Sequence, residues 1–134
     1  MKLVKRTSSL FAQPTFNSLL IRTFANESIP INGTARMVRL KVKGEADAIK
    51  AQDILAKAHQ VLKKEGKGYV GSTRFVCKAE WDVMCFYRFA NLDSLKQYMG
   101  SEVKEKKFEP LIAELKALAV DGKTHSQNFV ADDW

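Results

Sequence analysis

The feature that most constrains this chain is the segment DVMCFYRFANLDSLKQYM, residues 82–99, in which the spacing of apolar side chains changes once. Its first half alternates with period two and carries bulky side chains on both faces, which predicts a central strand covered on both sides. Asn91 and Asp93 then offer side-chain oxygens that cap helices, and Leu92, Leu95 and Met99 recur at helical spacing. A buried strand that leads directly into an amphipathic helix indicates half of an α+β sandwich. The two faces of the strand carry Val83, Cys85, Tyr87 and Phe89 on one side, and Asp82, Met84, Phe86 and Arg88 on the other.

Apolar periodicity predicts the remaining elements. Val38, Leu40 and Val42 alternate with cations in a first strand, Gly66 ends a long amphipathic helix, and Pro110 suits the first turn of a later one. The order is β-α-β-β-α-β, a ferredoxin-like α+β fold with a four-stranded antiparallel sheet and helices on one face. The predicted strands are residues 36–43, 69–78, 82–89 and 124–130, and the predicted helices are residues 45–64, 91–99 and 110–118.

The two bulky faces of the third strand also predict a partner. Helices on one face of a single sheet leave the other face open, where Met84 and Phe86 would meet solvent. A second copy that packs sheet against sheet around a two-fold axis would cover these side chains. We therefore expect protein partners at the open sheet face, in a homodimer or in a heteromeric complex.

The two cysteines, Cys77 and Cys85, lie in the two predicted middle strands. If these strands pair through a hairpin at residues 80–82, the cysteines lie roughly opposite each other, which would allow a disulfide. Two reduced cysteines in the core are favoured over a disulfide, because unpaired cysteine is among the most buried residue types.

The charge distribution argues against a nucleic-acid partner. The net charge is +7, and residues 1–26 contain Lys2, Lys5, Arg6 and Arg22 without any acidic residue. Four of the seven net positive charges therefore belong to the N-terminal segment, and the domain itself is only mildly basic. A mildly basic domain is a weak signal for nucleic-acid binding.

Residues 1–25 have the composition of a transit peptide, because they are basic, rich in hydroxyl groups and free of acids. The order Arg22, Thr23, Phe24, Ala25 resembles a mitochondrial processing site, so the mature protein would begin at Ala25; a flexible basic arm is the alternative. We expect a mitochondrial protein, in the matrix or on the matrix side of the inner membrane, with a plastid less favoured. No apolar run is long enough to span a membrane. Residues 1–35 are then a targeting segment and linker, and residues 36–134 form the domain.

The segment FANLDSLKQYMGSEV, residues 89–103, resembles the antibiotic-biosynthesis-monooxygenase-like family of dimeric α/β barrels, and the resemblance extends over about residues 36–130. Some members of this family oxidise aromatic polyketides or quinols without a cofactor, and others degrade haem. The tryptophan that distorts haem in the second group corresponds to Phe89, and its axial histidine falls on or beside Phe108. Phenylalanine cannot ligate iron, so the resemblance implies neither haem degradation nor a cofactor.

A cofactor-free oxygenase needs a cavity and a base or hydrogen-bond donor that ionises a phenolic substrate. The candidates for this role are Tyr87, Arg88 and Tyr98, with Asn91 as an amide donor. Each has an ordinary alternative, which we favour: the tyrosines as core aromatics, Arg88 as a surface or interface cation, and Asn91 as a helix cap. No cluster of Cys, His, Asp or Glu has the spacing of a metal site, and no glycine-rich phosphate loop is present.

Two functions remain. The favoured one is a non-catalytic accessory subunit of a large organellar assembly, such as a respiratory-chain complex. The alternative is a cofactor-independent monooxygenase that acts on a quinol or polyphenol. The alternative requires an apolar pocket that opens near Arg88 and Tyr98, and it is disfavoured if Phe86, Phe89 and Phe108 fill that volume.

Overall fold

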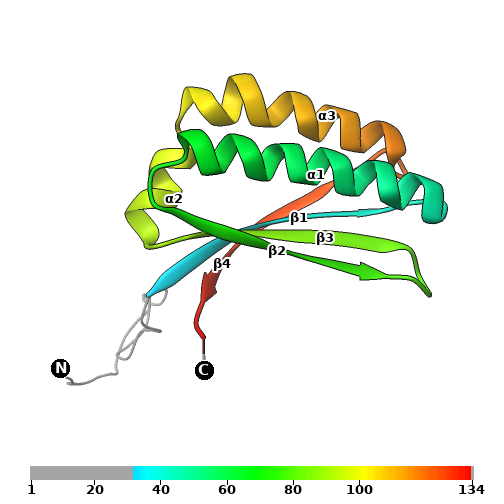
Figure 1. The fold of residues 1–134 in the computed structure, drawn as a ribbon, viewed down its shortest axis with the longest axis horizontal. Coiled ribbons are helices and arrows are strands. Elements are labelled where there is room, and N and C mark those ends of the chain that lie inside the picture. Colours follow the sequence, from blue (N-terminus) through cyan, green and yellow to red (C-terminus); the bar gives the residue numbers. More distant parts are fainter. Residues whose placement is uncertain (1–31, 134) are drawn as a thin grey trace, which may run out of the picture. The chain divides into compact units, whose positions relative to one another are not determined.

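The structure is a computed structural model that describes residues 32–133, so the predicted targeting segment and most of the linker lie outside the described residues. The described part forms a compact unit of its own. Figure 1 shows its helices on one side of a sheet. In chain order the elements are β1 (Gly33–Lys41), α1 (Glu45–Glu65), β2 (Tyr69–Cys77), β3 (Asp82–Phe89), α2 (Leu92–Met99), the π-helical segment η3 (Lys104–Phe108), α3 (Glu109–Leu118) and β4 (His125–Ala131).

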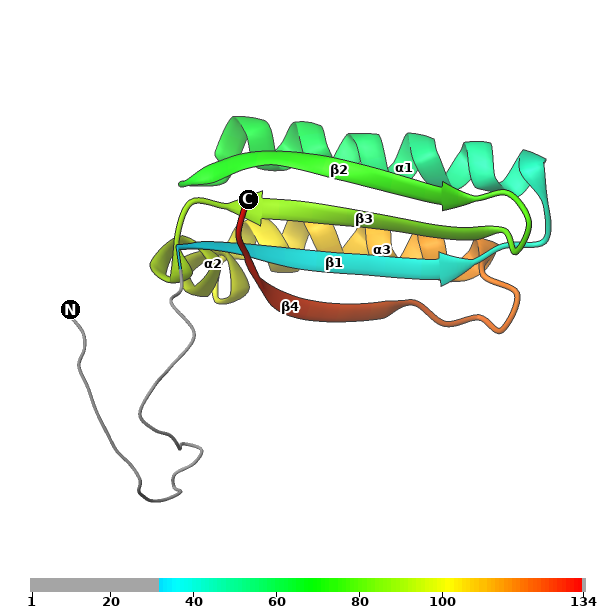
Figure 2. The same ribbon diagram turned by 90° about the horizontal axis from the view of Figure 1, so that it is seen from below.

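The four strands form one antiparallel sheet in the order β2-β3-β1-β4. Seen from the side opposite the helices, the whole sheet is in front and every helix is behind it (Figure 2). This arrangement confirms the predicted ferredoxin-like α+β fold, with β3 as a central strand. None of the helices in residues 32–133 is long and apolar enough to cross a membrane.

Strand β1 begins at Gly33, earlier than the predicted start at residue 36, because both of its neighbours extend that far. Thr34 pairs with Phe89 on β3 and with Val130 on β4. The buried Thr34 hydroxyl donates a hydrogen bond to the Asn91 carbonyl oxygen at 3.1 Å, which ties the start of β1 to the start of α2.

Helix α2 begins as predicted but buries a different face. The Asn91 side chain accepts a hydrogen bond from the Ser94 amide at 2.9 Å, so the predicted cap is confirmed. The fully buried residues are Leu95 and Tyr98, whereas Leu92 and Met99 are only half-buried.

The core lies between the helices and the sheet. Strand β3 contributes Val83, Cys85, Tyr87 and Phe89, each no more than 3% exposed, as its alternation predicted. Helix α1 covers them with Leu55 and its other inward-facing residues. Each fully buried side chain of this size stabilises the fold by about 1.5–3 kcal/mol relative to an exposed one.

The prediction that the two cysteines face each other across the hairpin is wrong. Cys77 pairs with Asp82 and Cys85 pairs with Arg74, because the hairpin turn occupies residues 78–81. Both thiols are free; Cys85 is in the core as expected, but Cys77 is exposed on the face of the sheet away from the helices.

Candidate functional site

The space between the helices and the sheet, where the alternative function requires a substrate cavity, is occupied by aromatic rings. Phe89 stacks on Tyr98 with ring centroids 5.3 Å apart. Phe108 forms T-shaped pairs with Tyr98 and Tyr87, with ring centroids 5.5 and 5.3 Å apart. Tyr69 lies at one end of this row of rings, with its ring centroid 5.7 Å from that of Phe89. Of the three phenylalanines that could fill this volume, Phe89 and Phe108 do so, and Phe86 lies on the opposite face of the sheet.

Tyr87 is a core tyrosine whose hydroxyl already has a partner. It is 0% exposed, and its hydroxyl donates a hydrogen bond to the Leu55 carbonyl oxygen at 2.9 Å. Burial raises the pKa of Tyr87 far above its ordinary value. The phenol is therefore neutral and bound to the backbone, which is the arrangement of a structural residue.

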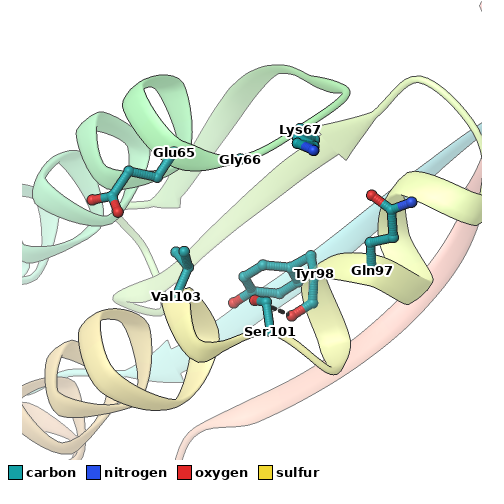
Figure 3. Close-up of a pocket in the computed structure, with 7 residues that line it drawn as sticks. All are labelled: Glu65, Gly66, Lys67, Gln97, Tyr98, Ser101 and Val103. Carbon is teal, nitrogen blue, oxygen red and sulfur yellow. Dashed lines mark hydrogen bonds between the residues drawn. The ribbon is translucent and has the colours of Figure 1, made fainter.

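Tyr98 is different, because its hydroxyl is buried and has no hydrogen-bond partner in the described part of the chain. Its ring lines a hollow of about 160 Å³ at the end of α1 (Figure 3). Burial raises the pKa of Tyr98 above the ordinary range, so the hydroxyl remains a neutral donor. The hollow can hold several water molecules or one small ligand. It is lined by Glu65, Gly66, Lys67, Gln97, Tyr98, Ser101 and Val103.

The side chains of Arg88 and Asn91 do not form a site together with Tyr98. Arg88 points to the open face of the sheet, where its guanidinium forms an ion pair with Asp133 at 3.3 Å. It lines a separate hollow of about 130 Å³ at the end of the sheet. Asn91 caps α2, and its side-chain oxygen is engaged by the Ser94 amide. The structure therefore does not bring the four sequence candidates into one site.

The open face of the sheet carries a continuous group of apolar side chains, which we call the apolar band. Phe86 lies 5.8 Å from Phe75 and 5.9 Å from Phe129, measured between ring centroids, so the rings connect β2, β3 and β4. Phe75 is 55% exposed and Phe129 is 38% exposed. The complete band consists of Phe75, Met84, Phe86, Met37, Ala35 and Phe129.

The charged residues around the apolar band are paired within the chain. The ion pairs are Arg39 with Asp82 at 3.4 Å, Lys41 with Glu80 at 3.2 Å, and Arg88 with Asp133 at 3.3 Å. Exposed pairs of this kind add little stability, but they make the face nearly neutral. A neutral face with an exposed apolar centre suits an apolar protein surface better than a polyanion.

A cluster of polar side chains between α1 and β2 was not predicted. His59 Nδ1 lies 2.6 Å from the Tyr69 hydroxyl and 3.1 Å from the Ser72 hydroxyl. Both hydroxyls meet the same ring nitrogen, whereas a catalytic serine–histidine–acid relay uses both nitrogens. The cluster therefore has the arrangement of a structural link between α1 and β2, and not that of a catalytic relay. Burial is the main cause that raises the pKa of Tyr69 to about 12.

Spacing in the sequence could not reveal this cluster, because its members come together only through the packing of a helix against an edge strand. Within residues 32–133, no group of three or more His, Cys, Asp or Glu side chains is placed to hold a metal ion.

Comparisons with known proteins identify the fold through structure alone. No family model matches the chain, and no curated protein matches its sequence. Solved structures do match. A monooxygenase from Streptomyces coelicolor, ActVA-Orf6, in complex with nanaomycin D aligns with a TM-score of 0.61 at 16% identity, over 79% of this chain and 93% of that one.

Two other solved structures also match in fold at low sequence identity. SnoaB, a cofactor-independent oxygenase from Streptomyces nogalater, aligns with a TM-score of 0.58 at 14% identity, over 77% of this chain and 96% of that one. A dimeric ferredoxin-like protein of unknown function from Jannaschia sp. aligns with a TM-score of 0.52 at 14% identity, over 72% of this chain and 97% of that one. The resemblance to antibiotic-biosynthesis-monooxygenase-like proteins is thus confirmed at the level of fold, and identity this low carries no function with it.

Proposed function

We propose that this protein is a non-catalytic accessory subunit of a large mitochondrial assembly, such as a respiratory-chain complex, and that it binds its protein partner through the open face of the sheet. The observation that carries the proposal is the apolar band, in which Phe75 and Phe129 remain exposed while the interior is filled. An exposed apolar surface rimmed by polar groups is typical of protein interaction sites.

The packing of the interior supports a binding role over catalysis. Phe89 and Phe108 occupy the volume in which an oxygenase of this fold would need space for a substrate. The candidate groups Tyr87 and Arg88 already hold structural partners on opposite faces of β3. An enzyme needs its acid–base groups within reach of one substrate atom, and this arrangement does not provide that.

The mitochondrial part of the proposal is supported by the sequence. Residues 1–25 are basic and free of acidic residues, and they precede a domain that is only mildly basic. Import into the matrix would place the domain where large respiratory assemblies expose their matrix surfaces. A fluorescent fusion of residues 1–35 is expected to enter mitochondria, and a fusion that stays in the cytosol would contradict this part of the proposal.

The main test is native electrophoresis of solubilised mitochondria that contain the tagged full-length chain. We expect the wild type to migrate with an assembly of high mass. Phe86→Asp places a charge at the centre of the apolar band and should release the protein from that assembly. Ile49→Asp is the matched control, because Ile49 is 52% exposed on α1, on the helix side of the sheet. Wild-type protein that migrates free of any assembly would overturn the proposal.

A second candidate function is a cofactor-independent monooxygenase that acts on a quinol or polyphenol. One observation favours it: the Tyr98 hydroxyl is a buried donor without a partner, beside a hollow of about 160 Å³. The oxygen of this hydroxyl is inaccessible in the structure, so it would bind the oxygen of a phenolic substrate only after the hollow opens towards it. Oxygen uptake in the presence of a quinol, lost in Tyr98→Phe and retained in Arg88→Gln, would support this function. Equal, negligible uptake by all three proteins would exclude this role for the hollow.

A further inference from the structure

Strand β4 lies at the edge of the sheet and lacks the features that protect edge strands. Within the described residues it has a neighbour on one side only, which is β1. Its sequence, HSQNFVA, contains no Lys, Arg, Asp, Glu, Gly or Pro, and all of its residues except the last are exposed. Natural edge strands are usually interrupted by charges, prolines or bulges, which prevent another strand from pairing with them. The edge of β4 is therefore a place where another strand can add.

The opposite edge of the sheet provides a comparison. Strand β2 carries the exposed Arg74 and has a bulge between Tyr69 and Gly71, where its register with β3 shifts. A charge and a bulge are two of the features that stop an edge from pairing. Such protection is present at β2 and absent from β4, so the two edges of the described sheet are not equivalent.

We propose that the protein partner adds one extended segment to the outer edge of β4, as an antiparallel fifth strand that continues the sheet. The inference rests on the proposed function, because it describes how the partner on the apolar band is held. Phe129 belongs to both features, since its ring is part of the apolar band and its strand forms the edge. A second copy of this chain, paired edge to edge, would leave both apolar bands bare. A strand from a different protein that also covers the band is therefore favoured.

The backbone hydrogen bonds of β1 show which groups of β4 are free for this strand. The Val42 amide donates a hydrogen bond to the Trp81 carbonyl oxygen at 2.9 Å, so Val42 faces β3. Because successive residues of a strand point their N–H and C=O groups to alternate sides, Met37 and the other odd-numbered residues of β1 face β4. Their partners in β4 are also odd-numbered. The outward-facing N–H and C=O groups of β4 are therefore those of Ser126, Asn128 and Val130.

The chemistry of the added strand follows from what lies beside it. A residue opposite Phe129 would have its side chain on the open face and would extend the apolar band, so an apolar or aromatic residue is expected there. Lys123 precedes β4, and Asp132 follows it. An antiparallel strand would begin beside Asp132 and end beside Lys123. The segment should therefore carry a cation near its start and a carboxylate near its end.

Proline at position 128 tests the outward-facing N–H without removing a hydrogen bond within the sheet. Proline lacks this N–H and is tolerated in edge strands where the N–H faces solvent. Asn128→Ala is the matched control, because it loses the same side chain, including its hydrogen bond from Arg36, but keeps the N–H. We expect Asn128→Pro and Asn128→Ala to unfold at similar temperatures. Gln127→Pro, which removes an N–H that faces β1, should unfold at a clearly lower temperature.

The main experiment is native electrophoresis of solubilised mitochondria that contain the tagged full-length variants. We expect Asn128→Ala to join the high-mass assembly as the wild type does. The amount of Asn128→Pro in the assembly should be lower by about fivefold or more, because one hydrogen bond is lost and the ring obstructs the added strand. Equal amounts of the two variants in the assembly would overturn the added strand and leave the proposed function standing. Wild-type protein that migrates free of any assembly would overturn the proposed function and this inference together.

Hydrogen exchange provides a second readout, which needs no variant. In the wild-type assembly, isolated through the tag, the amides of Ser126, Asn128 and Val130 should exchange at least about tenfold more slowly than in the purified chain, as measured by mass spectrometry of proteolytic peptides. Unchanged exchange would overturn the inference even if Asn128→Pro does not fold. Slow exchange that is already present in the purified chain would show that the edge of β4 is covered without a partner protein, and would overturn it as well.

Discussion

At the scale of single residues, Tyr87 and Tyr98 form a natural pair for comparison. Both are buried tyrosines that touch Phe108, but only the Tyr87 hydroxyl has a hydrogen-bond partner. A buried hydroxyl without a partner costs about 1–3 kcal/mol in desolvation, whereas a satisfied one contributes about 1 kcal/mol.

Replacing each of these tyrosines by phenylalanine should therefore change stability in opposite directions. Tyr87→Phe should lower the free energy of unfolding by about 1 kcal/mol, because the Leu55 carbonyl loses its donor. Tyr98→Phe should leave it unchanged or raise it by about 1 kcal/mol. Urea denaturation of both variants measures the difference. A loss of similar size in both would show that the Tyr98 hydroxyl is satisfied in solution.

Tyr69 makes the stability of the fold depend on alkaline pH. Its pKa is raised to about 12, mainly by burial, so the unfolded chain loses this proton at a lower pH than the folded one. The unfolded state then binds fewer protons, and stability falls as pH rises. The contribution of Tyr69 is complete below pH about 10 and is lost as pH rises towards 12. Tyr69→Phe should lose less stability than the wild type over this interval, in denaturation curves measured at several pH values.

At the scale of elements, the turn between α1 and β2 depends on a glycine. Gly68 has φ +73°, and a Cβ there would lie 2.6 Å from the Cβ of Ser94 on α2. Its carbonyl oxygen accepts a hydrogen bond from the Ala90 amide at 2.8 Å, which ties this turn to the end of β3. The turn and the start of α2 are thus packed directly against each other.

Gly68→Ala should destabilise the protein by more than backbone strain alone. Gly122 provides the control, because it has φ +71° but nothing within 4 Å of its Cβ position. Gly122→Ala should cost about 1–2 kcal/mol, the price of a left-handed conformation for a residue with a side chain. Gly68→Ala should cost clearly more, since α2 must also move away. Thermal denaturation of both variants tests this, and equal losses would contradict the close contact with Ser94.

The sequence pattern predicted which helices and strands form more accurately than it predicted which of their faces are buried and how neighbouring strands are aligned. The change of period near Asn91 located both the end of β3 and the cap of α2, because capping chemistry is local. The buried face of α2 was missed, because Tyr98 turns its ring inward to stack on Phe89, and periodicity does not weigh that contact.

Two other features of the structure also depend on packing that the sequence pattern does not describe. The register of Cys77 and Cys85 depends on the length of the turn at residues 78–81, and a one-residue slip moves a side chain to the other face. For the candidate site, the sequence pointed to Tyr98 but could not show that its hydroxyl lacks a partner, since that depends on everything packed around it.

At the scale of the whole molecule, one sheet has a covered face and a face that carries the apolar band. The sequence predicted this asymmetry correctly, because alternation on β3 places Phe86 and Met84 away from the helices. It could not predict which side chains make up the band, because that depends on the registers of three strand pairs taken together.

If folding is coupled to pairing of two copies, the thermal midpoint should depend on protein concentration. We expect the midpoint of the wild type to rise when the concentration increases tenfold, because the paired state is favoured by mass action. Phe86→Asp should show a lower midpoint that does not change with concentration. Scanning calorimetry at two concentrations measures both. A wild-type midpoint that is independent of concentration would mean that folding is complete within one copy.

The local pairing of Arg39, Lys41 and Arg88 with carboxylates has a consequence for the temperature range in which an assembly persists. Since these charges are already compensated, association would draw its driving force from water released by the aromatic and methionine side chains. That force weakens on cooling and strengthens in sulfate solutions. The subunit should therefore dissociate on ice and reassociate on warming, while moderate sodium chloride leaves it bound.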